Sequence, residues 1–320
     1  MSENMENIIE ISNLTKYYGS LFWKKKKPSL CELNLAVPEG SIFGFLGPNG
    51  AGKTTTIKIL MNLIKQSSGE ALVLGFPPDN IEAKRLIGFL PDAPAFSPYL
   101  SAAEFLNICA KLFGIPSAIR KKRIAEVLEN VKMTRHAKSK LGGFSRGMTQ
   151  RIGIAQAILN NPKLLILDEP LVGLDPHGRQ ELKDIILDQK ARGTSVFFCS
   201  HILSDAEKIC DRIGILFESR LLCAGRLDEL LSETGSKLHI NPGRDDIVKE
   251  LLSAATETVK RPDGGWELSF LKKEETTQAL LATKAKYGDA VTITGFRESL
   301  EDFFFRKIEE ATKSRLEETL

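Results

Sequence analysis

The stretch Gly47–Thr55 reads GPNGAGKTT and follows the apolar run Ile42–Leu46. Its fixed positions fill the pattern G-x-x-x-x-G-K-[ST], and a helix-forming segment begins within it. Glycines in such a loop let backbone N–H groups converge on phosphate oxygens, and the helix N-terminus adds its positive end. The order of strand, loop and helix therefore predicts a phosphate-binding loop at the end of a buried strand.

The last three side chains of this loop have distinct expected roles. We expect Lys53 between the β- and γ-phosphates of ATP, the Thr54 hydroxyl on Mg²⁺ and Thr55 at the α-phosphate. The nucleotide-binding residues that the loop predicts are Gly47, Pro48, Asn49, Gly50, Ala51, Gly52, Lys53, Thr54 and Thr55.

A second chemical motif, LLILDEP, begins at Leu164. Its four apolar residues bring Asp168 and Glu169 to the carboxyl end of a buried strand. Two adjacent carboxylates in such a place are costly unless a metal ion or a positive charge compensates them, which argues against a purely structural role. We predict that Asp168 holds Mg²⁺ through water and that Glu169 orients or deprotonates the attacking water, so that ATP is hydrolysed.

Strand-like and helical segments alternate over residues 1–225. Several of the strand candidates are continuous apolar runs, which is typical of a sheet buried on both faces, so an α/β nucleotide-binding core is expected. The expected strands are Ile8–Leu14, Leu33–Val37, Ile42–Leu46, Ala71–Leu74, Ile87–Leu90, Leu164–Leu167, Ser195–Cys199 and Arg212–Leu216. The expected helices are Thr54–Ile64, Ala102–Phe113, Ala118–Val131, Met148–Asn160, Pro176–Ala191 and Ser204–Cys210.

The pattern changes over residues 226–320. A short helix at Leu227–Glu233 leads to elements in the order β-α-β-β-α-β, and the Asp-Gly-Gly of RPDGGW (Arg261–Trp266) is a hairpin signal. This order predicts a small α+β domain of ferredoxin-like fold. Its closing helix, from Ser299, carries an apolar stripe that serves either its own core or a homodimer contact.

Bulk composition excludes several classes of function. The net charge of +3 over 320 residues gives no footprint for nucleic acid. The five cysteines have no metal or CxxC spacing, so reduced cysteines in a cytosolic protein are expected. The segment Met1–Glu10 is acidic and polar, unlike a signal peptide, and no run of about 18 apolar residues predicts a membrane span. A role at the membrane therefore requires a partner.

A lysine run, Lys24–Lys27, lies within LFWKKKKPSL (Leu21–Leu30) between two expected strands. It is interpreted either as a solvated loop insertion or as a contact to anionic lipid headgroups or an acidic partner. The neighbouring Phe22 and Trp23 favour the second interpretation.

The stretch Gly142–Leu159, GGFSRGMTQRIGIAQAIL, predicts a helix with an exposed N-terminus suited to a second anion. FSRGMTQR precedes LLILDEP, which is followed by GLDP (Gly173–Pro176) and by CSH ending at His201. This combination resembles the ATP-binding subunits of ABC transporters over roughly residues 5–225. The resemblance implies a P-loop NTPase core of the ABC ATPase type, with a helical signature subdomain at about 93–160.

The resemblance also implies roles for single residues. Tyr18 in LTKYYG looks like the aromatic side chain that stacks on adenine, with Tyr17 as the alternative. His201 resembles the switch residue that contacts the γ-phosphate and orders the water. Asp175 resembles the aspartate that crosses between subunits.

Two segments differ from the family's usual sequence motifs. The signature, usually written LSGGQ, keeps Ser145 and Gly147 for the phosphate of the partner subunit's ATP, but Phe144, Arg146 and Met148 differ. Arg146 adds a positive charge that helps bind phosphate or points to solvent. Asp92 stands where the family has a glutamine that contacts Mg²⁺ and water, and it acts either as a metal contact or as a turn residue between prolines.

Three features resemble the ABC-2 type exporter ATPases. They are the motif LPDAP (Leu90–Pro94), the single catalytic domain and the appended C-terminal domain. That group implies a homodimer or heterodimer around two ATP molecules. It also implies a transmembrane permease docked near residues 93–113 and a location at the cytoplasmic face of the inner membrane. The alternative is a soluble ABC-type ATPase that acts on ribosomes or DNA. The role of the C-terminal domain stays open: it regulates the protein, strengthens the dimer or has no function.

Overall fold

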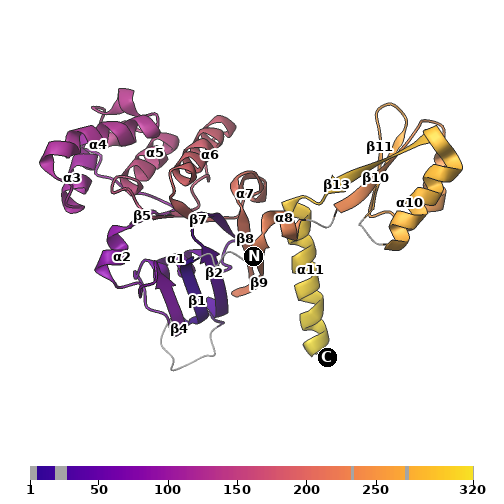
Figure 1. The fold of residues 1–320 in the computed structure, drawn as a ribbon, viewed down its shortest axis with the longest axis horizontal. Coiled ribbons are helices and arrows are strands. Elements are labelled where there is room, and N and C mark those ends of the chain that lie inside the picture. The colour runs from indigo at the N-terminus through magenta and orange to yellow at the C-terminus, as the bar shows by residue number, and fades with distance from the viewer. Residues whose placement is uncertain (1–5, 19–26, 232–233, 271–273, 320) are drawn as a thin grey trace. The chain divides into compact units, whose positions relative to one another are not determined.

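The computed structural model describes residues 6–18, 27–231, 234–270 and 274–319. The chain forms two compact units, Met1–Arg226 and Leu227–Leu320, which are described separately (Figure 1). Lys24, Lys25 and Lys26 of the lysine run lie outside the described residues. Lys27 is described and forms an ion pair with Glu218 at 3.4 Å.

A six-stranded sheet with the order β5-β6-β7-β3-β8-β9 is the framework of the first unit. Its parallel strands are β3 (Ile42–Leu46), β5 (Ile87–Leu90), β6 (Leu164–Asp168), β7 (Ser195–Ser200) and β8 (Arg212–Phe217). The edge strand β9 (Arg220–Arg226) pairs antiparallel with β8. Every residue of β3, β6 and β7 is buried, because helices or a second sheet cover both faces.

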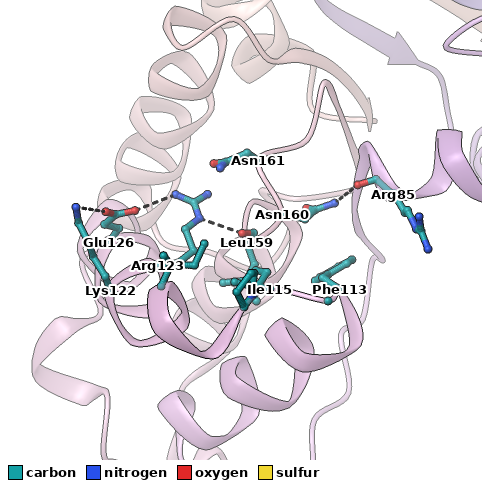
Figure 2. A pocket seen from close by; sticks show the side chains of 12 residues that line it. Arg85, Phe113, Ile115, Lys122, Arg123, Glu126, Leu159, Asn160 and Asn161 are labelled. Carbon is teal, nitrogen blue, oxygen red and sulfur yellow. Dashed lines mark hydrogen bonds and ion pairs between the residues drawn. The ribbon is translucent and has the colours of Figure 1, made fainter.

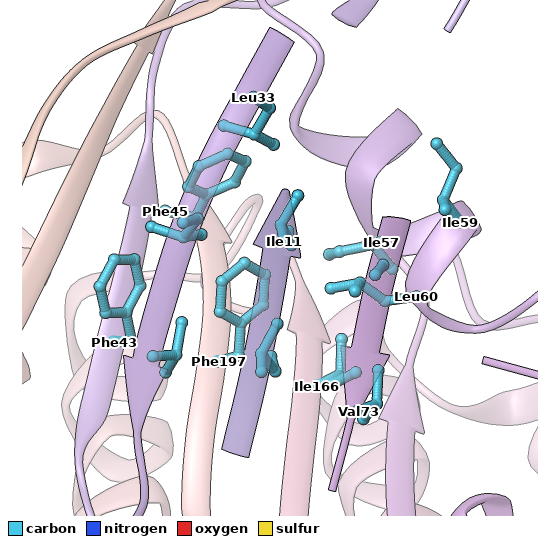
Figure 3. Close-up of a cluster of buried hydrophobic side chains, with 14 of the residues drawn as sticks. Ile11, Leu33, Phe43, Phe45, Ile57, Ile59, Leu60, Val73, Ile166 and Phe197 are labelled. Carbon is cyan, nitrogen blue, oxygen red and sulfur yellow. The ribbon is translucent and has the colours of Figure 1, made fainter. Parts of the chain in front are cut away.

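An antiparallel sheet, β2-β1-β4, packs near the central one. It consists of β1 (Asn7–Lys16), β2 (Leu30–Pro38) and β4 (Ser68–Val73). Side chains from both sheets and from α1 (Lys53–Leu60) share one hydrophobic cluster (Figure 3). Phe197 lies at its centre, with ring centroids 5.8 Å from Phe43 and 5.5 Å from Phe45. This core fixes the helix that follows the phosphate-binding loop.

Three helices pack on one another as a subdomain (Figure 1): α3 (Ala102–Leu112), α4 (Ser117–Asn130) and α5 (Arg146–Ala157). Ser101 and Glu104 form a reciprocal capping box at the start of α3. The short 3₁₀ turns η1 (Thr134–His136) and η2 (Leu141–Gly143) precede α5. The remaining helices of this unit are α2 (Ile81–Arg85), α6 (Pro176–Ala191), which packs on β7, and α7 (Leu203–Ile209), which packs on β3.

The second unit contains a four-stranded antiparallel sheet with the order β11-β12-β10-β13. Its elements are α8 (Leu227–Leu230), β10 (Thr234–Ile240), α9 (Asp245–Leu251), β11 (Glu257–Lys260), β12 (Trp266–Phe270), α10 (Glu274–Tyr287), η3 (Gly288–Ala290), β13 (Val291–Arg297) and α11 (Leu300–Thr319). Leu238 and Leu268 pair at the centre of its core. Two β-α-β halves that interleave in this order form the expected ferredoxin-like fold.

The sequence-based prediction differs from the structure mainly at the ends of elements. The helix expected to begin at Met148 begins at Arg146, because the Ser145 hydroxyl caps it by accepting from the Met148 N–H at 3.3 Å. Strand β9 was not predicted: its turn uses Glu218 and Ser219 at φ of 44° and 71°, without the Asn-Gly signal of such turns. The five-residue helix α2 was also not predicted.

Two expectations from composition are tested by the described residues. None of the five cysteines, all of which lie in the described ranges, forms a disulfide, and three of them are buried. No helix in the described ranges is long and apolar enough to cross a membrane.

Candidate ATP-binding and hydrolysis site

The phosphate-binding loop joins β3 to α1 and has tight steric limits. A Cβ atom on Gly47 would lie 2.2 Å from the Leu216 carbonyl oxygen, so a larger residue does not fit there. Gly52 caps α1 with φ of 116°, a conformation that favours glycine. Lys53 is buried, and its ammonium donates to the carbonyl oxygens of Gly47 at 2.7 Å and Pro48 at 3.2 Å. The loop is thus curled around a fixed cation.

The carboxylates of Asp168 and Glu169 meet this loop because β6, β7 and β3 are adjacent parallel strands. The Lys53 Nζ lies 3.3 Å from Glu169 Oε1. The Thr54 hydroxyl donates to Asp168 Oδ1 at 3.3 Å. Glu169 has φ of 49°, a left-handed conformation that is strained for a residue with a side chain. The chain therefore holds this carboxylate beside the lysine at some cost in backbone energy.

His201 follows β7 and reaches the same glutamate. Its Nδ1 lies 3.0 Å from Glu169 Oε2, and its backbone N–H donates to that oxygen at 3.4 Å. Glu169 thus has one carboxylate oxygen toward Lys53 and the other toward His201. A glutamate held from both sides has a fixed orientation, which suits a base that must meet one water molecule.

Burial raises the pKa of Asp168 from its ordinary 3.8 to about 6. The negative charges of Glu169 and Asp92 add to this rise, while the Thr54 hydrogen bond and the charge of Lys53 oppose it. A hydroxyl and a carboxylate are the hard oxygen ligands that Mg²⁺ prefers, so Thr54 and Asp168 fit that ion. Asp92 is exposed and close enough for its charge to act on Asp168, but its role as a ligand or a turn residue stays a prediction.

The raised pKa of Asp168 predicts a pH-dependent gain in stability for Asp168→Asn. A folded-state pKa raised above the unfolded value gives stability that is present below about pH 4 and lost as the pH rises through about 6. In EDTA and without nucleotide, we expect the variant to be more stable than the parent at pH 7.5, by up to about 3 kcal/mol. The gain should fall to about 1 kcal/mol at pH 4.5, because that pH still lies above the unfolded-state pKa. Thermal melts at both pH values check this, with the exposed Asp188→Asn as control. An equal loss of stability at both pH values would contradict it.

Tyr18 follows strand β1, and its hydroxyl lies near the end of the phosphate-binding loop. Its hydroxyl is 3.4 Å from the Thr55 hydroxyl, which is also 2.9 Å from that of Ser29. Its ring is about half exposed, with Lys16 Nζ 5.4 Å from the centroid. Tyr17 is equally exposed, and its backbone N–H donates to Ser67. An open ring face beside Thr55 is what stacking on adenine needs, and that role stays a prediction for Tyr18.

The signature residues Ser145, Arg146 and Gly147 open α5 beside the GLDP segment (Gly173–Pro176). A Cβ atom on Gly173 would lie 2.6 Å from the Arg146 guanidinium, so this side chain covers Gly173. Gly147 faces Leu174, and Asp175 caps α6 by accepting from the Gly178 N–H at 3.0 Å. Within the described residues, no hydrogen bond or ion pair joins Ser145, Arg146, Gly147 or Asp175 to the phosphate-binding loop of the same chain.

Sequence reasoning did not find several polar residues around the site. Ser29 follows the lysine run and contacts Thr55, but a lone serine carries no sequence signal. Gln150 is buried in α5 and donates to the Pro170 carbonyl oxygen at 3.0 Å. Gln150 stands between Thr149 and Arg151 in the sequence, so nothing in the local pattern marks it as a buried residue. Gln150 ties the signature helix to the segment after Glu169.

A pocket of about 490 Å³ lies where α3 meets α4 (Figure 2). Arg123 crosses it and donates to the carbonyl oxygens of Leu159 at 2.9 Å and Ile158 at 2.6 Å. The labelled lining residues are Arg85, Phe113, Ile115, Lys122, Arg123, Glu126, Leu159, Asn160 and Asn161. Leu112 beside it is 83% exposed and Ile119 on its wall 54%. Basic and apolar groups thus share this surface.

The loop, the carboxylate pair and the helical subdomain together define an ATP-binding cassette. The family model for ABC transporters matches residues 30–172. An uncharacterized ABC transporter ATP-binding protein of Nostoc sp. is 40% identical over 98% of this chain and 93% of its own. This chain belongs to the ATP-binding proteins of ABC transporters.

Two further relatives are informative. The bacitracin transport ATP-binding protein BcrA of Bacillus licheniformis is 46% identical over 221 residues, which are 68% of this chain and 69% of the relative. A dimeric ATP-binding cassette solved in a post-hydrolysis state with ADP and Pi is 25% identical, with a TM-score of 0.61 over 68% of this chain and 98% of its own.

Proposed function

We propose that this protein is the ATP-hydrolysing subunit of an ABC-2 type exporter. The observation that carries the proposal is Glu169, held between Lys53 at 3.3 Å and His201 at 3.0 Å beside the buried Asp168. The similarity to a bacitracin transport ATP-binding protein supports the exporter group. The test is release of phosphate from ATP by the purified chain, followed by identification of the membrane protein that co-purifies with it. Co-purification with ribosomes or DNA and without a membrane protein would overturn the exporter assignment.

In the proposed reaction, the loop Gly47–Thr55 binds the triphosphate through its backbone N–H groups and Lys53. Thr54 and Asp168 would hold Mg²⁺, which neutralises charge on the phosphate oxygens when bound. Glu169 accepts the proton of the attacking water, and His201 fixes the orientation of Glu169. The lysine beside the carboxylate stabilises negative charge as the γ-phosphate departs.

We further propose that two chains enclose two ATP molecules, with Ser145, Arg146, Gly147 and Asp175 of each facing the ATP of the other. The similarity to a dimeric cassette supports this arrangement. The N-terminus of α5 is suited to an anion, since its first N–H groups and dipole attract negative charge. The unit Leu227–Leu320 has an accessory or regulatory role in this proposal, and the choice between homodimer and heterodimer is left to the co-purification.

The proposed permease dock is the segment 93–113, extended into the pocket between α3 and α4. Exposed Leu112 and Ile119 offer apolar area there, beside the ion pairs of Arg85 with Glu82 and of Lys122 with Glu126. Docking on the permease would hold the chain at the cytoplasmic face of the membrane. Contact of Lys24–Lys27 with anionic lipid is a separate proposal that vesicle flotation tests.

The proposed dock predicts that Leu112→Glu loses permease binding but keeps ATP hydrolysis. A charge at this exposed apolar position should weaken capture of the permease at least about tenfold, because a carboxylate is costly to bury at an interface. Phosphate release by the isolated subunit should be unchanged. Pull-down from membranes and a phosphate assay measure the two effects. Leu281→Glu, at a 60% exposed leucine of α10, is the matched control. Equal capture by both variants would remove the segment from the dock.

A further inference from the structure

A buried ion-pair cluster joins α6, which follows the GLDP segment, to α7, which follows His201. Lys183 Nζ lies 2.9 Å from Asp205 Oδ1, and Arg179 Nη1 lies 3.6 Å from Asp205 Oδ2. Lys183 is 4% exposed and Asp205 5%. Buried charges cost solvation energy, so their pairing restricts the helices to positions in which the charges meet.

Arg179 makes a second contact with the GLDP segment itself. Its Nε donates to the Leu174 carbonyl oxygen at 3.1 Å, one residue before Asp175. A guanidinium is planar and has five N–H donors, so one side chain can face a backbone oxygen and a carboxylate together. Arg179 therefore bridges the loop that carries Asp175 and the helix that follows His201.

Helix α7 depends on such external contacts for its placement. It has only seven residues and no side-chain cap at its N-terminus, and helices this short are unstable alone. Asp205 lies in its first turn, four residues after His201. Asp205 Oδ2 accepts no hydrogen bond from any described residue, and the cation that faces it is Arg179.

We propose that Arg179 is a positioning residue for ATP hydrolysis, which rests on the function proposed above. It fixes the position of the Leu174–Asp175 backbone relative to the segment that carries His201. His201 then holds Glu169 at 3.0 Å while Asp175 is presented to the partner subunit. Arg179 itself touches neither ATP nor water in this proposal.

The test compares Arg179→Ala and Arg179→Lys with the parent chain. We expect kcat to fall about tenfold in both variants while KM for ATP stays within about twofold, because misplacement of reacting groups acts on the chemical step. Lysine keeps the charge but lacks the planar fork, so it should not rescue the alanine variant. Arg192→Ala, which removes a surface pair with Asp188 on the same helix, is the matched control.

A second readout separates this proposal from the proposed function. The chain has four histidines, so the imidazole signals are resolvable by NMR and the His201→Gln variant assigns one of them. Arg179→Ala should move the His201 signal and leave those of His136 and His239 in place. An unmoved His201 signal, or full rescue by lysine, overturns the positioning role. If the signal moves but the parent chain hydrolyses no ATP, Arg179 positions His201 and it is the proposed function that is overturned. Thermal melts exclude unfolding, and Arg179→Lys repeats the NMR test if the alanine variant unfolds.

Discussion

We expect Glu169→Gln to lower steady-state ATP hydrolysis by about 10²–10⁴-fold, the range typical of losing a general base. Glutamine has the shape of glutamate and retains an oxygen for the Lys53 ammonium and an amide for the His201 ring. ATP binding should therefore persist while the proton of the attacking water has no acceptor. With Mg²⁺ and ATP, the variant should accumulate as a nucleotide-bound dimer.

Size-exclusion chromatography with light scattering, together with a phosphate assay, measures both parts of this prediction. Glu257→Gln makes the same chemical change at an exposed site on β11 and should behave as the parent does. His201→Ala should also be slow, because Glu169 loses the contact on its second oxygen. Hydrolysis at the parent rate, or a variant that stays monomeric with ATP, would contradict the assignment of Glu169 and the dimer model.

The placement of the loop and of the two carboxylates was predictable from the sequence because each motif is local. GPNGAGKTT and LLILDEP each place their polar side chains at the end of a buried strand, and β3 and β6 end as predicted to within a residue. The strand pairing that brings Glu169 to Lys53 depends on β7 lying between β6 and β3, which is a long-range choice. The alternating pattern predicted an α/β core, but it did not predict this order of strands.

Contacts between distant side chains were not predictable from the sequence in the same way. The sequence left Arg146 open between phosphate and solvent, whereas the folded chain lays it on Gly173, 27 positions away. Arg179 and Asp205 carry no motif, and their pairing requires that α6 and α7 pack side by side. The turn at Glu218 and Ser219 adopts positive φ without a glycine, so the local sequence gave no sign of it.

If each ATP site is built from two chains, as proposed above, the second large effect is complementation between two inactive variants. Lys53→Met removes the cation of the phosphate-binding loop, and Gly147→Asp adds a negative charge where the partner's phosphate is expected. Each homodimer should lose at least about 100-fold in hydrolysis, because loss of one such electrostatic contact costs that much. Gly147 tolerates a side chain locally, since its Cβ position has only an ordinary contact with Leu174 at 3.5 Å.

Mixing the two variants in equal amounts should restore hydrolysis to about a quarter of the parent rate. Half of the dimers are then mixed, and each holds one site built from an intact loop and an intact Ser145–Gly147 segment. Gly147→Ala separates size from charge, because it adds a methyl group and no charge and should keep most of the activity. Mass photometry and a phosphate assay on the mixture make the measurement. If both sites were complete within one chain, mixing would restore nothing, because every chain would carry its own defect into the mixture.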